Sequence, residues 1–217
     1  MDSLSGVGVL DKAIAVLTAV ESAPRPLSLA ELVAATGLSR ATAHRLASAL
    51  ATHGLVRRDD EGRWSLGLRL IGLGHAAAEA LPGWLDARPA LEWLRSQTGE
   101  SVQLYVRDGD ERVCVESLEA PHELRTIVPV GARLPLDRGS GGRVLVDGRA
   151  VAPGWVASVA ERAPGVASVS APVRDPAGRV VAAVSVSGPV ERTGRTPGDR
   201  YGDAVVEAAA RIAASLA

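Results

Sequence analysis

The sequence has little cysteine, no long apolar run and no excess of positive charge, and each shortage excludes a class of protein. Cys114 is the single cysteine of the 217 residues, which excludes an internal disulfide and a zinc site built from several thiolates. Its neighbours Val113 and Val115 predict a strand, where a lone cysteine is usually a small core residue. No stretch of roughly 18 apolar residues occurs, so no membrane-spanning helix is expected.

Targeting and catalytic signals are also missing. The segment Met1–Leu10 lacks the basic and apolar regions of a secretion signal, so a cytoplasmic location is expected. No GxSxG elbow, HExxH pair or P-loop is present, and Glu100, Asp108 and Asp110 lie at predicted turns. The four histidines show no metal-ligand spacing: His44, His53, His75 and His122. We therefore expect no enzyme, metal or cofactor, although an enzyme acting on a small metabolite stays an alternative hypothesis.

The charge of the chain is nearly balanced, with a formal net charge of −1. Any binding of nucleic acid must therefore come from a local basic patch. The segment between Leu32 and Arg58 holds such a patch, because it contains four arginines and no acidic residue.

Local signals predict three helices in the first quarter of the chain. Apolar residues recur at helical spacing over Leu10–Ser22, and Pro24 and Pro26 end that helix. Ser28 and Glu31 form a capping box at the start of the helix Ser28–Thr36, and Gly37 suits its end. Ser39 is placed to cap the helix Arg40–His53.

The second and third helices, joined by a short turn with a glycine, have the pattern of a helix-turn-helix. The third helix would enter the major groove of DNA, where arginine recognises guanine through two hydrogen bonds. A hairpin over 55–66, with its turn at 59–62, would form a wing that contacts phosphates. The predicted DNA-contacting residues are Ser39, Arg40, Thr42, Ala43, His44, Arg45, Arg57, Arg58 and Arg63. An ordinary helical bundle and a winged helix that binds protein remain alternatives.

The rest of the chain has a different pattern. A helix is expected over Leu66–Ala80, Pro82 and Gly83 mark a domain boundary, and a helix follows over Trp84–Gln97 with a possible kink at Pro89. Strands are predicted over Val102–Arg107, Arg112–Glu116, Arg125–Val130, Val166–Val173 and Val180–Ser187, and helices over Ser140–Val146 and Asp203–Leu216. Hairpins alternating with helices favour an α+β design, an antiparallel sheet covered by helices.

Several segments resemble one family of bacterial regulators, the IclR type. They lie in both halves of the chain: Val7–Ala13, Leu29–Leu32, Gly37–Leu46, Tyr105–Val115, Gly165–Val173 and Val180–Pro189. Within the family the sequence is most similar to an actinobacterial subgroup linked to amino-acid metabolism, including leucine biosynthesis.

The resemblance implies a ligand-responsive DNA-binding regulator with three parts. These are a winged helix-turn-helix over residues 1–66, a linker helix over 67–83 and a GAF-like effector-binding domain over 84–217. It also implies a homodimer or tetramer that binds a double-stranded DNA operator and a small-molecule effector. A dimer suits symmetric half-sites in such an operator.

The resemblance also places an effector pocket in the second half. Its residues are Leu134, Gly141, Gly142, Ser158, Ser168, Ser185 and Ser187. The amides that open the helix at Ser140 suit a carboxylate, and the serines at 185 and 187 face the same side of a strand. Alternatively, the serines are small residues that pack tightly in a sheet. The segment Asp147–Pro153 is shorter than in the family, which would leave one wall of the pocket more open.

Overall fold

The computed structural model describes residues 5–80, 87–147 and 154–216. The chain divides into two compact units, residues 1–80 and 81–217, and each unit is described by itself. Among the described residues, no helix is both long and apolar enough to cross a membrane.

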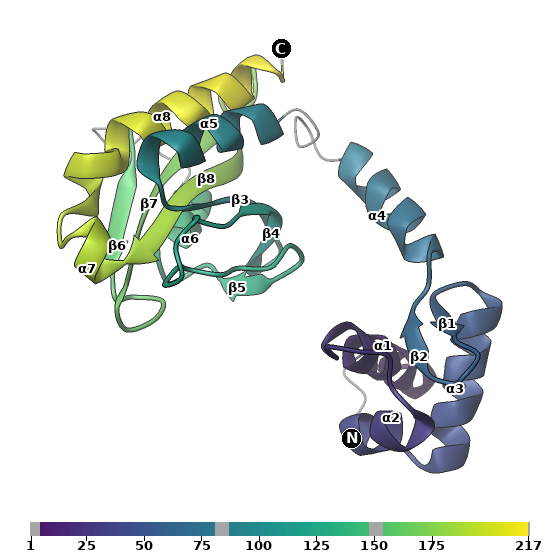
Figure 1. Cartoon of the computed structure of the whole chain (residues 1–217). Helices are drawn as coiled ribbons and strands as arrows, with labels where there is room; N and C mark the ends of the chain where they lie inside the picture. Colours follow the sequence, from purple (N-terminus) through teal and green to yellow (C-terminus); the bar gives the residue numbers. More distant parts are fainter. Residues whose placement is uncertain (1–4, 81–86, 148–153, 217) are drawn as a thin grey trace. The chain divides into compact units, whose positions relative to one another are not determined.

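The first unit consists of three helices, a two-stranded hairpin and a further helix (Figure 1). These elements are α1 (Gly8–Glu21), α2 (Leu29–Thr36), α3 (Arg40–Thr52), β1 (Val56–Arg58), β2 (Trp64–Leu66) and α4 (Arg69–Glu79). The predicted capping box is present, since the Ser28 amide donates to Glu31 at 2.8 Å and the Glu31 amide donates to the Ser28 hydroxyl at 3.3 Å. Gly37 ends α2 with φ of 66°, the left-handed conformation that glycine adopts without steric cost.

The core of this unit lies between the helices and the hairpin. It contains Val16, Val20, Leu32, Leu46, Ala47, Leu50, Val56 and Trp64. The apolar residues Leu10 and Ile14 at the start of α1 do not belong to this core, and each is about half exposed. Residues Val16 and Val20 therefore form the buried face of α1.

The hairpin is held against the helices by a third extended segment. Val56 to Arg58 pair antiparallel with Trp64 to Leu66, and Leu27 exchanges two backbone hydrogen bonds with Trp64, of 2.9 and 2.7 Å. Because Leu66 belongs to β2, α4 begins later than expected, at Arg69. A Cβ at Gly67 would lie 2.0 Å from the Gly54 carbonyl oxygen, so this close backbone approach requires glycine.

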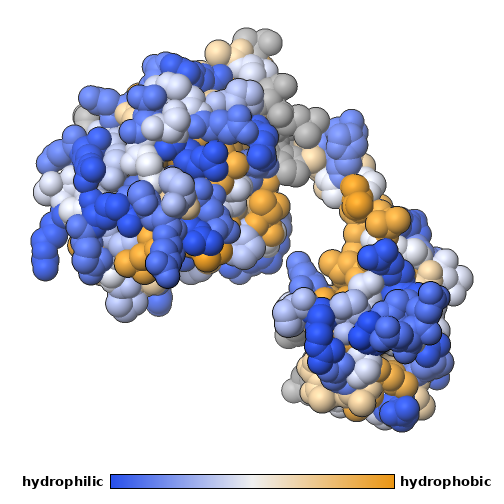
Figure 2. All heavy atoms as spheres, viewed as in Figure 1, coloured by the Kyte–Doolittle hydropathy of each residue, from blue (hydrophilic) through white to orange (hydrophobic). Residues whose placement is uncertain are grey.

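Helix α4 and its N-cap residue Leu68 carry apolar side chains that the first unit does not cover. Leu68 and Ile71 are about 70% exposed, and Leu73 is about half exposed. Figure 2 shows this hydrophobic surface along α4.

The second unit is a six-stranded antiparallel sheet with helices on both faces (Figure 1). Its strands are β3 (Ser101–Asp108), β4 (Glu111–Leu118), β5 (Arg133–Pro135), β6 (Val156–Val159), β7 (Val166–Arg174) and β8 (Val180–Pro189). They lie in the order β5-β4-β3-β8-β7-β6. The helices are α5 (Arg88–Thr98), α6 (Ser140–Asp147), α7 (Val190–Thr193) and α8 (Pro197–Ala214). The predicted α+β class is confirmed.

The period-two alternation of the strands gives the sheet two different faces. Val102, Leu104 and Val184 join Leu91 of α5 and Val205 of α8 in the larger apolar core. Side chains from alternate positions face α6 instead. These include Tyr105, Cys114 and Ala183 in a second apolar cluster and a group of buried serines.

The structure corrects several predicted elements of the second half. Residues 125–130 are not a strand, because their backbone does not pair with a neighbouring strand. Pairing with β4 begins where the Gly131 amide donates to the Cys114 carbonyl, and β5 follows. Strand β6 and helix α7 were not predicted, and α8 starts at Pro197, before Asp203.

The predicted kink at Pro89 is also wrong. Helix α5 begins at Arg88, so Pro89 lies in its first turn, where no intrahelical amide partner is lost. Residues 84–86 of the predicted helix lie outside the described residues.

Candidate DNA interface and effector site

The N-terminus of α3 is capped by Ser39 and exposes a polar side. The Thr42 amide donates to the Ser39 hydroxyl at 3.3 Å, and that hydroxyl lies 2.9 Å from the Thr42 hydroxyl. Arg40, His44 and Arg45 are exposed, whereas Thr42 is half-buried. Ala43 has no exposed surface and packs inside the unit, so its predicted place among the DNA-contacting residues is corrected: its methyl group is not accessible to DNA.

Two of the three wing arginines, Arg57 and Arg58, have no acidic partner among the described residues. The Arg58 Nε donates to the Gly62 carbonyl at 3.1 Å, and its guanidinium lies 5.4 Å from the ring centroid of Trp64. The Arg57 Nε donates to the Ser65 hydroxyl at 3.0 Å. Both side chains belong to exposed residues. Their positive charge is therefore available to a phosphate.

Arg63 differs, because the acidic turn of the wing neutralises it. Its guanidinium lies 3.2 Å from Asp59 and 2.9 Å from Glu61. The backbone hydrogen bond from Arg63 is the largest cause that lowers the pKa of Asp59, so the pair stays charged. A phosphate would have to compete with two carboxylates for Arg63.

The wing and α3 meet at one surface hollow. It is lined by Leu29, Arg40, Ala41, His44 and Arg58. The rings of His44 and Trp64 are in edge contact, with centroids 6.4 Å apart. Cationic groups from the predicted recognition helix and from the predicted wing thus share one surface. Within the described part of the chain, Arg40, Arg45, Arg57 and Arg58 form no ion pair.

The second unit contains a connected group of serine hydroxyls between α6 and the sheet. The Ser140 hydroxyl lies 2.7 Å from those of Ser168 and Ser170. The Ser158 hydroxyl lies 3.0 Å from that of Ser168 and accepts from the Ser140 amide at 3.1 Å. Ser170 is also hydrogen-bonded to Ser185. Because each of these hydroxyls has a hydrogen-bond partner among its neighbours, the serine group is stable as long as the side chains stay in contact.

Arg112 is a buried cation beside these serines. It is 2% exposed, donates to the Arg138 carbonyl at 2.7 Å, and lies 5.3 Å from the ring centroid of Tyr105. Its Nε has no acceptor, and no carboxylate of the described residues forms an ion pair with it. Burial lowers the pKa of Arg112, since the charged form loses hydration. A buried guanidinium without a counter-ion suits an anionic partner.

The cavity between these groups is small. It measures about 20 Å³ and is lined by Gln103, Tyr105, Arg112, Gly139, Ser140, Gly141, Arg162, Ser168, Ser185 and Ser187. Such a volume holds about one water molecule. The shortened segment 147–153 led us to expect a more open pocket. Most of that segment lies outside the described residues. The described residues that line the cavity pack against one another and leave little free volume.

The structure brings together most, but not all, of the predicted effector residues. Gly141, Ser168, Ser185 and Ser187 line the cavity, and Ser158 is one hydrogen bond away. Leu134 instead packs against the apolar cluster around Tyr105. A Cβ at Gly142 would lie 2.2 Å from the Leu136 carbonyl oxygen, so Gly142 permits close packing of α6 and does not line the cavity.

Five lining side chains were missed by the prediction: Gln103, Tyr105, Arg112, Ser140 and Arg162. The sequence does contain a signal for Gln103 and Tyr105: they alternate with Val102 and Leu104 along β3 and therefore lie on the opposite face of the sheet. The Gln103 side chain accepts from the Ser187 hydroxyl at 2.9 Å. No local pattern marks Arg112 or Arg162.

Comparisons with known proteins agree with both halves of the structure. Residues 9–60 match the model of the IclR helix-turn-helix domain, and residues 84–152 and 148–214 match that of the bacterial transcriptional regulator IclR C-terminal domain. The HTH-type transcriptional regulator KipR of Bacillus subtilis is 37% identical over 120 residues, which cover 55% of this chain and 48% of KipR.

Two longer matches cover nearly the whole chain. The glycerol operon regulatory protein of Streptomyces griseus is 31% identical over 219 residues, 84% of this chain and 85% of that protein. The crystal structure of an IclR homologue from Microbacterium hydrocarbonoxydans, complexed with 4-hydroxybenzoate, has the same fold. Its TM-score is 0.80 at 21% identity, over 96% of this chain and 98% of that one.

A winged helix-turn-helix followed by a GAF-like α+β unit defines a transcriptional regulator with a DNA-binding part and an effector-binding part. The chain belongs to the IclR family of bacterial transcriptional regulators. These are regulators and not enzymes, so the enzymatic alternative is wrong.

Proposed function

We propose that the exposed side of α3 reads the operator and that the wing holds its phosphates. Arg40, His44 and Arg45 would meet base edges in the major groove, with Ser39 and Thr42 at the helix start. Arg57 and Arg58 would bind the backbone. The observation that carries this assignment is the set of four exposed arginines on α3 and β1 that form no ion pair with any described residue.

We propose the domain limits of the sequence analysis for this function. Residues 1–66 would bind DNA, 67–83 would link, and 84–217 would bind the effector. The compact first unit and the covered sheet of the second support this division, although residues 81–86 lie outside the described residues. A protein that binds chromosomal DNA would act in the cytoplasm.

We propose that the serine cavity is the inner part of the effector site. The buried cation Arg112 and the orphaned amide nitrogen of Gln103 favour an effector with an anionic or strongly polar group. Because the closed cavity holds about one water, the serines must separate before an effector occupies it. We also propose target genes in amino-acid or small-organic-acid metabolism, including leucine biosynthesis, and the sequence resemblance alone supports this part of the proposal.

We propose that the protein is a dimer, or a tetramer built from dimers, and that it dimerises through its first unit. The uncovered apolar side chains of α4, together with Leu10 and Ile14 of α1, support this assignment. A large groove lined mainly by α1 and by the residues that follow it is apolar as well. Burying such surface against a second copy is favourable by about 25 cal/mol per Å².

The decisive experiment is capture of genomic DNA fragments by the purified full chain, followed by gel-shift assays on the captured sequences. We expect sequence-specific binding that an Arg40→Ala, Arg45→Ala double variant abolishes or redirects. The matched control is Arg195→Gln, which changes an exposed arginine of the second unit. Failure to bind any fragment more tightly than random DNA would refute the proposal.

A further inference from the structure

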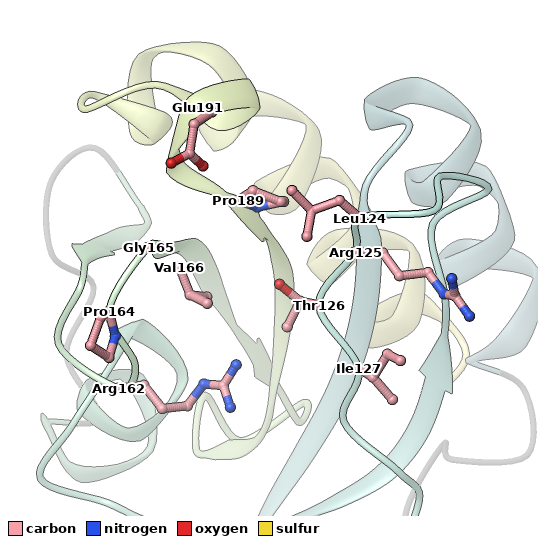
Figure 3. A pocket seen from close by; sticks show the side chains of 10 residues that line it. All are labelled: Leu124, Arg125, Thr126, Ile127, Arg162, Pro164, Gly165, Val166, Pro189 and Glu191. Atoms are coloured by element: carbon pink, nitrogen blue, oxygen red, sulfur yellow. The ribbon is translucent and has the colours of Figure 1, made fainter.

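Each unit has a surface hollow beside its proposed binding residues. In the second unit, side chains of the loop 124–127, of Arg162 and of Pro189 surround the larger hollow (Figure 3). This hollow shares Arg162 with the serine cavity and therefore belongs with the effector site proposed above. In the first unit, the hollow between α3 and the wing is lined by two side chains that contact Trp64, a buried residue outside the proposed set of DNA contacts.

The backbone of Trp64 fixes the wing to its unit. The Trp64 amide donates to the Leu27 carbonyl at 2.7 Å, the Trp64 carbonyl accepts from the Leu27 amide at 2.9 Å, and Arg58 lies directly opposite Trp64 in the hairpin. Because the polar groups of Trp64 point to Leu27 and not to β1, Arg58 and Trp64 form a non-hydrogen-bonded pair, in which opposite side chains lie closer together. The register therefore places the Arg58 side chain beside the indole ring.

The side chain of Trp64 contacts both elements that carry the proposed DNA contacts. The Arg58 guanidinium lies 5.4 Å from the ring centroid, within the distance of about 6 Å at which an aromatic face attracts a cation. The His44 ring of α3 meets the indole edge-on, with centroids 6.4 Å apart and planes at 78°. One rigid ring thus contacts a side chain of α3 and a side chain of the wing.

Burial in the core does not by itself account for a tryptophan at this position. Trp64 is 2% exposed and belongs to the core of the first unit, but its Nε1 has no hydrogen-bond acceptor among the described residues. A buried donor without a partner is destabilising, and a phenylalanine or leucine would avoid that cost. The contacts of the ring with Arg58 and His44 supply a reason for its presence.

Arg58 benefits from such a support because no acid holds it. Its Nε donates to the Gly62 carbonyl at 3.1 Å, and it forms no ion pair with any described residue, whereas Arg63 has two acidic partners. An exposed arginine held by one hydrogen bond samples many rotamers, so ordering it on a phosphate costs conformational entropy. Stacking on the ring of Trp64 lowers that cost before DNA is bound.

We propose that Trp64 is a positioning residue of the DNA interface. Its ring holds Arg58 of the wing and His44 of α3 at one spacing, so that the wing and the helix engage DNA together. Arg58 is thereby preorganised for a phosphate, and His44 stays at the hollow that it lines with Arg40 and Arg58. The effect on binding rests on the proposed DNA interface, whereas the contacts of the ring in the free protein do not.

The test compares two replacements of Trp64 in the full chain. Trp64→Phe keeps an aromatic face and loses the unpaired donor, whereas Trp64→Leu keeps an apolar side chain and loses the face. Val16→Ala is the matched control, because Val16 is a fully buried residue of the same core but belongs to α1. Urea titrations give the stability of each variant. Fluorescence anisotropy gives its affinity for a captured operator and for random DNA between about 50 and 200 mM salt.

We expect Trp64→Leu to weaken binding to both DNAs several-fold and to lower the slope of log affinity against log salt concentration by about 0.9 per bound copy, because the Arg58 phosphate contact is lost. Trp64→Phe should keep the slope and most of the affinity, even where it lowers stability. Val16→Ala should lower stability and leave the slope unchanged. An unchanged slope in Trp64→Leu, or an equal loss of slope in Val16→Ala, would overturn the proposal.

A double-variant cycle shows whether Arg58 acts through Trp64. Arg58→Gln should weaken DNA binding several-fold in the wild-type background and little in the Trp64→Leu background, since residues that act together give non-additive effects. Additive effects would contradict the positioning role.

NMR of the arginine side chains tests the proposal even if Trp64→Leu does not fold. In the free wild-type chain, the Arg58 Nε–H should be more ordered than that of Arg45, for which no side-chain hydrogen bond occurs within the described residues. The ring current of Trp64 should also shift the Arg58 side-chain protons upfield. Equal mobility of the two arginines would refute the preorganisation.

Other outcomes separate this proposal from the proposed function. If the wild type binds captured and random DNA equally, sequence reading is refuted, and a loss of slope on random DNA in Trp64→Leu still supports the role of Trp64. If the wild type reads the operator and Trp64→Leu does so with unchanged affinity and slope, the DNA interface stands and the positioning role is wrong. If the wild type binds no DNA, both are refuted.

Discussion

The wing arginine Arg57 offers a quantitative test of the DNA interface. Arg57 is exposed and lies in β1. Among the described residues its side chain hydrogen-bonds Ser65 and forms no ion pair, so Arg57→Gln removes a charge without leaving a buried partner. Each phosphate contact contributes about 0.9 to the slope of log affinity against log salt concentration. A dimer with Arg57 on two phosphates should therefore lose about 1.8 from that slope.

The expected change is large enough to measure. Between 50 and 200 mM salt, a slope difference of about 1.8 corresponds to about twelvefold, so the variant should lose about twelvefold less affinity than the wild type over this range. A single bound copy would give a slope difference of about 0.9, or about 3.5-fold. Fluorescence anisotropy on one captured operator, repeated on random DNA, provides both slopes. The control Arg195→Gln should leave both unchanged.

Equal salt slopes for wild type and Arg57→Gln would show that Arg57 touches no phosphate. A change confined to the operator, absent on random DNA, would equally contradict the reasoning. Phosphate contacts position the protein but do not read sequence.

Three further predictions concern sequence preference, the buried thiol and the core. Arg45→Ala should change the preferred base at one position of each half-site by about tenfold, as measured by selection from random oligonucleotides; an unchanged preference would place Arg45 off the bases. Burial raises the pKa of Cys114 to about 12, so iodoacetamide at pH 8 should alkylate the native chain at least about 100-fold more slowly than the urea-unfolded chain. Because the unfolded thiol loses its proton first, stability should also fall as the pH rises from about 9 towards 12, and rapid native alkylation would contradict this burial. Leu32→Ala in the core of the first unit should lower its free energy of unfolding by about 2–5 kcal/mol in urea titrations, whereas Glu21→Ala at an exposed position should change it little.

The sequence predicted the first unit well because its signals are local. The capping box of Ser28 and Glu31, the left-handed Gly37 and the capping Ser39 each act within a few residues, so their hydrogen bonds are already specified by spacing. Element type and order in this unit therefore needed no knowledge of distant contacts. Ala43 was nevertheless predicted to contact DNA, although its position on the apolar stripe of α3 already indicated that it is buried.

The second unit was predicted less completely because its sheet pairs residues far apart in sequence. Residues 125–130 have strand-like composition but no neighbouring strand, whereas β6 forms because β7 offers it an edge. No local sequence pattern predicts which segment pairs with the edge of the sheet.

The sequence by itself determined the helix-turn-helix, the arginine-rich and acid-free segment, and the alternation that places Ser185 and Ser187 on one face. Periodicity and capping are properties of neighbouring residues. Only the tertiary structure decided that Asp59 and Glu61 neutralise Arg63, while Arg57 and Arg58 form no ion pair with any described residue. Only folding placed Arg112 and Arg162 beside serines from three other elements, with no carboxylate partner among the residues that the structure describes, because burial and charge pairing depend on contacts across the sheet.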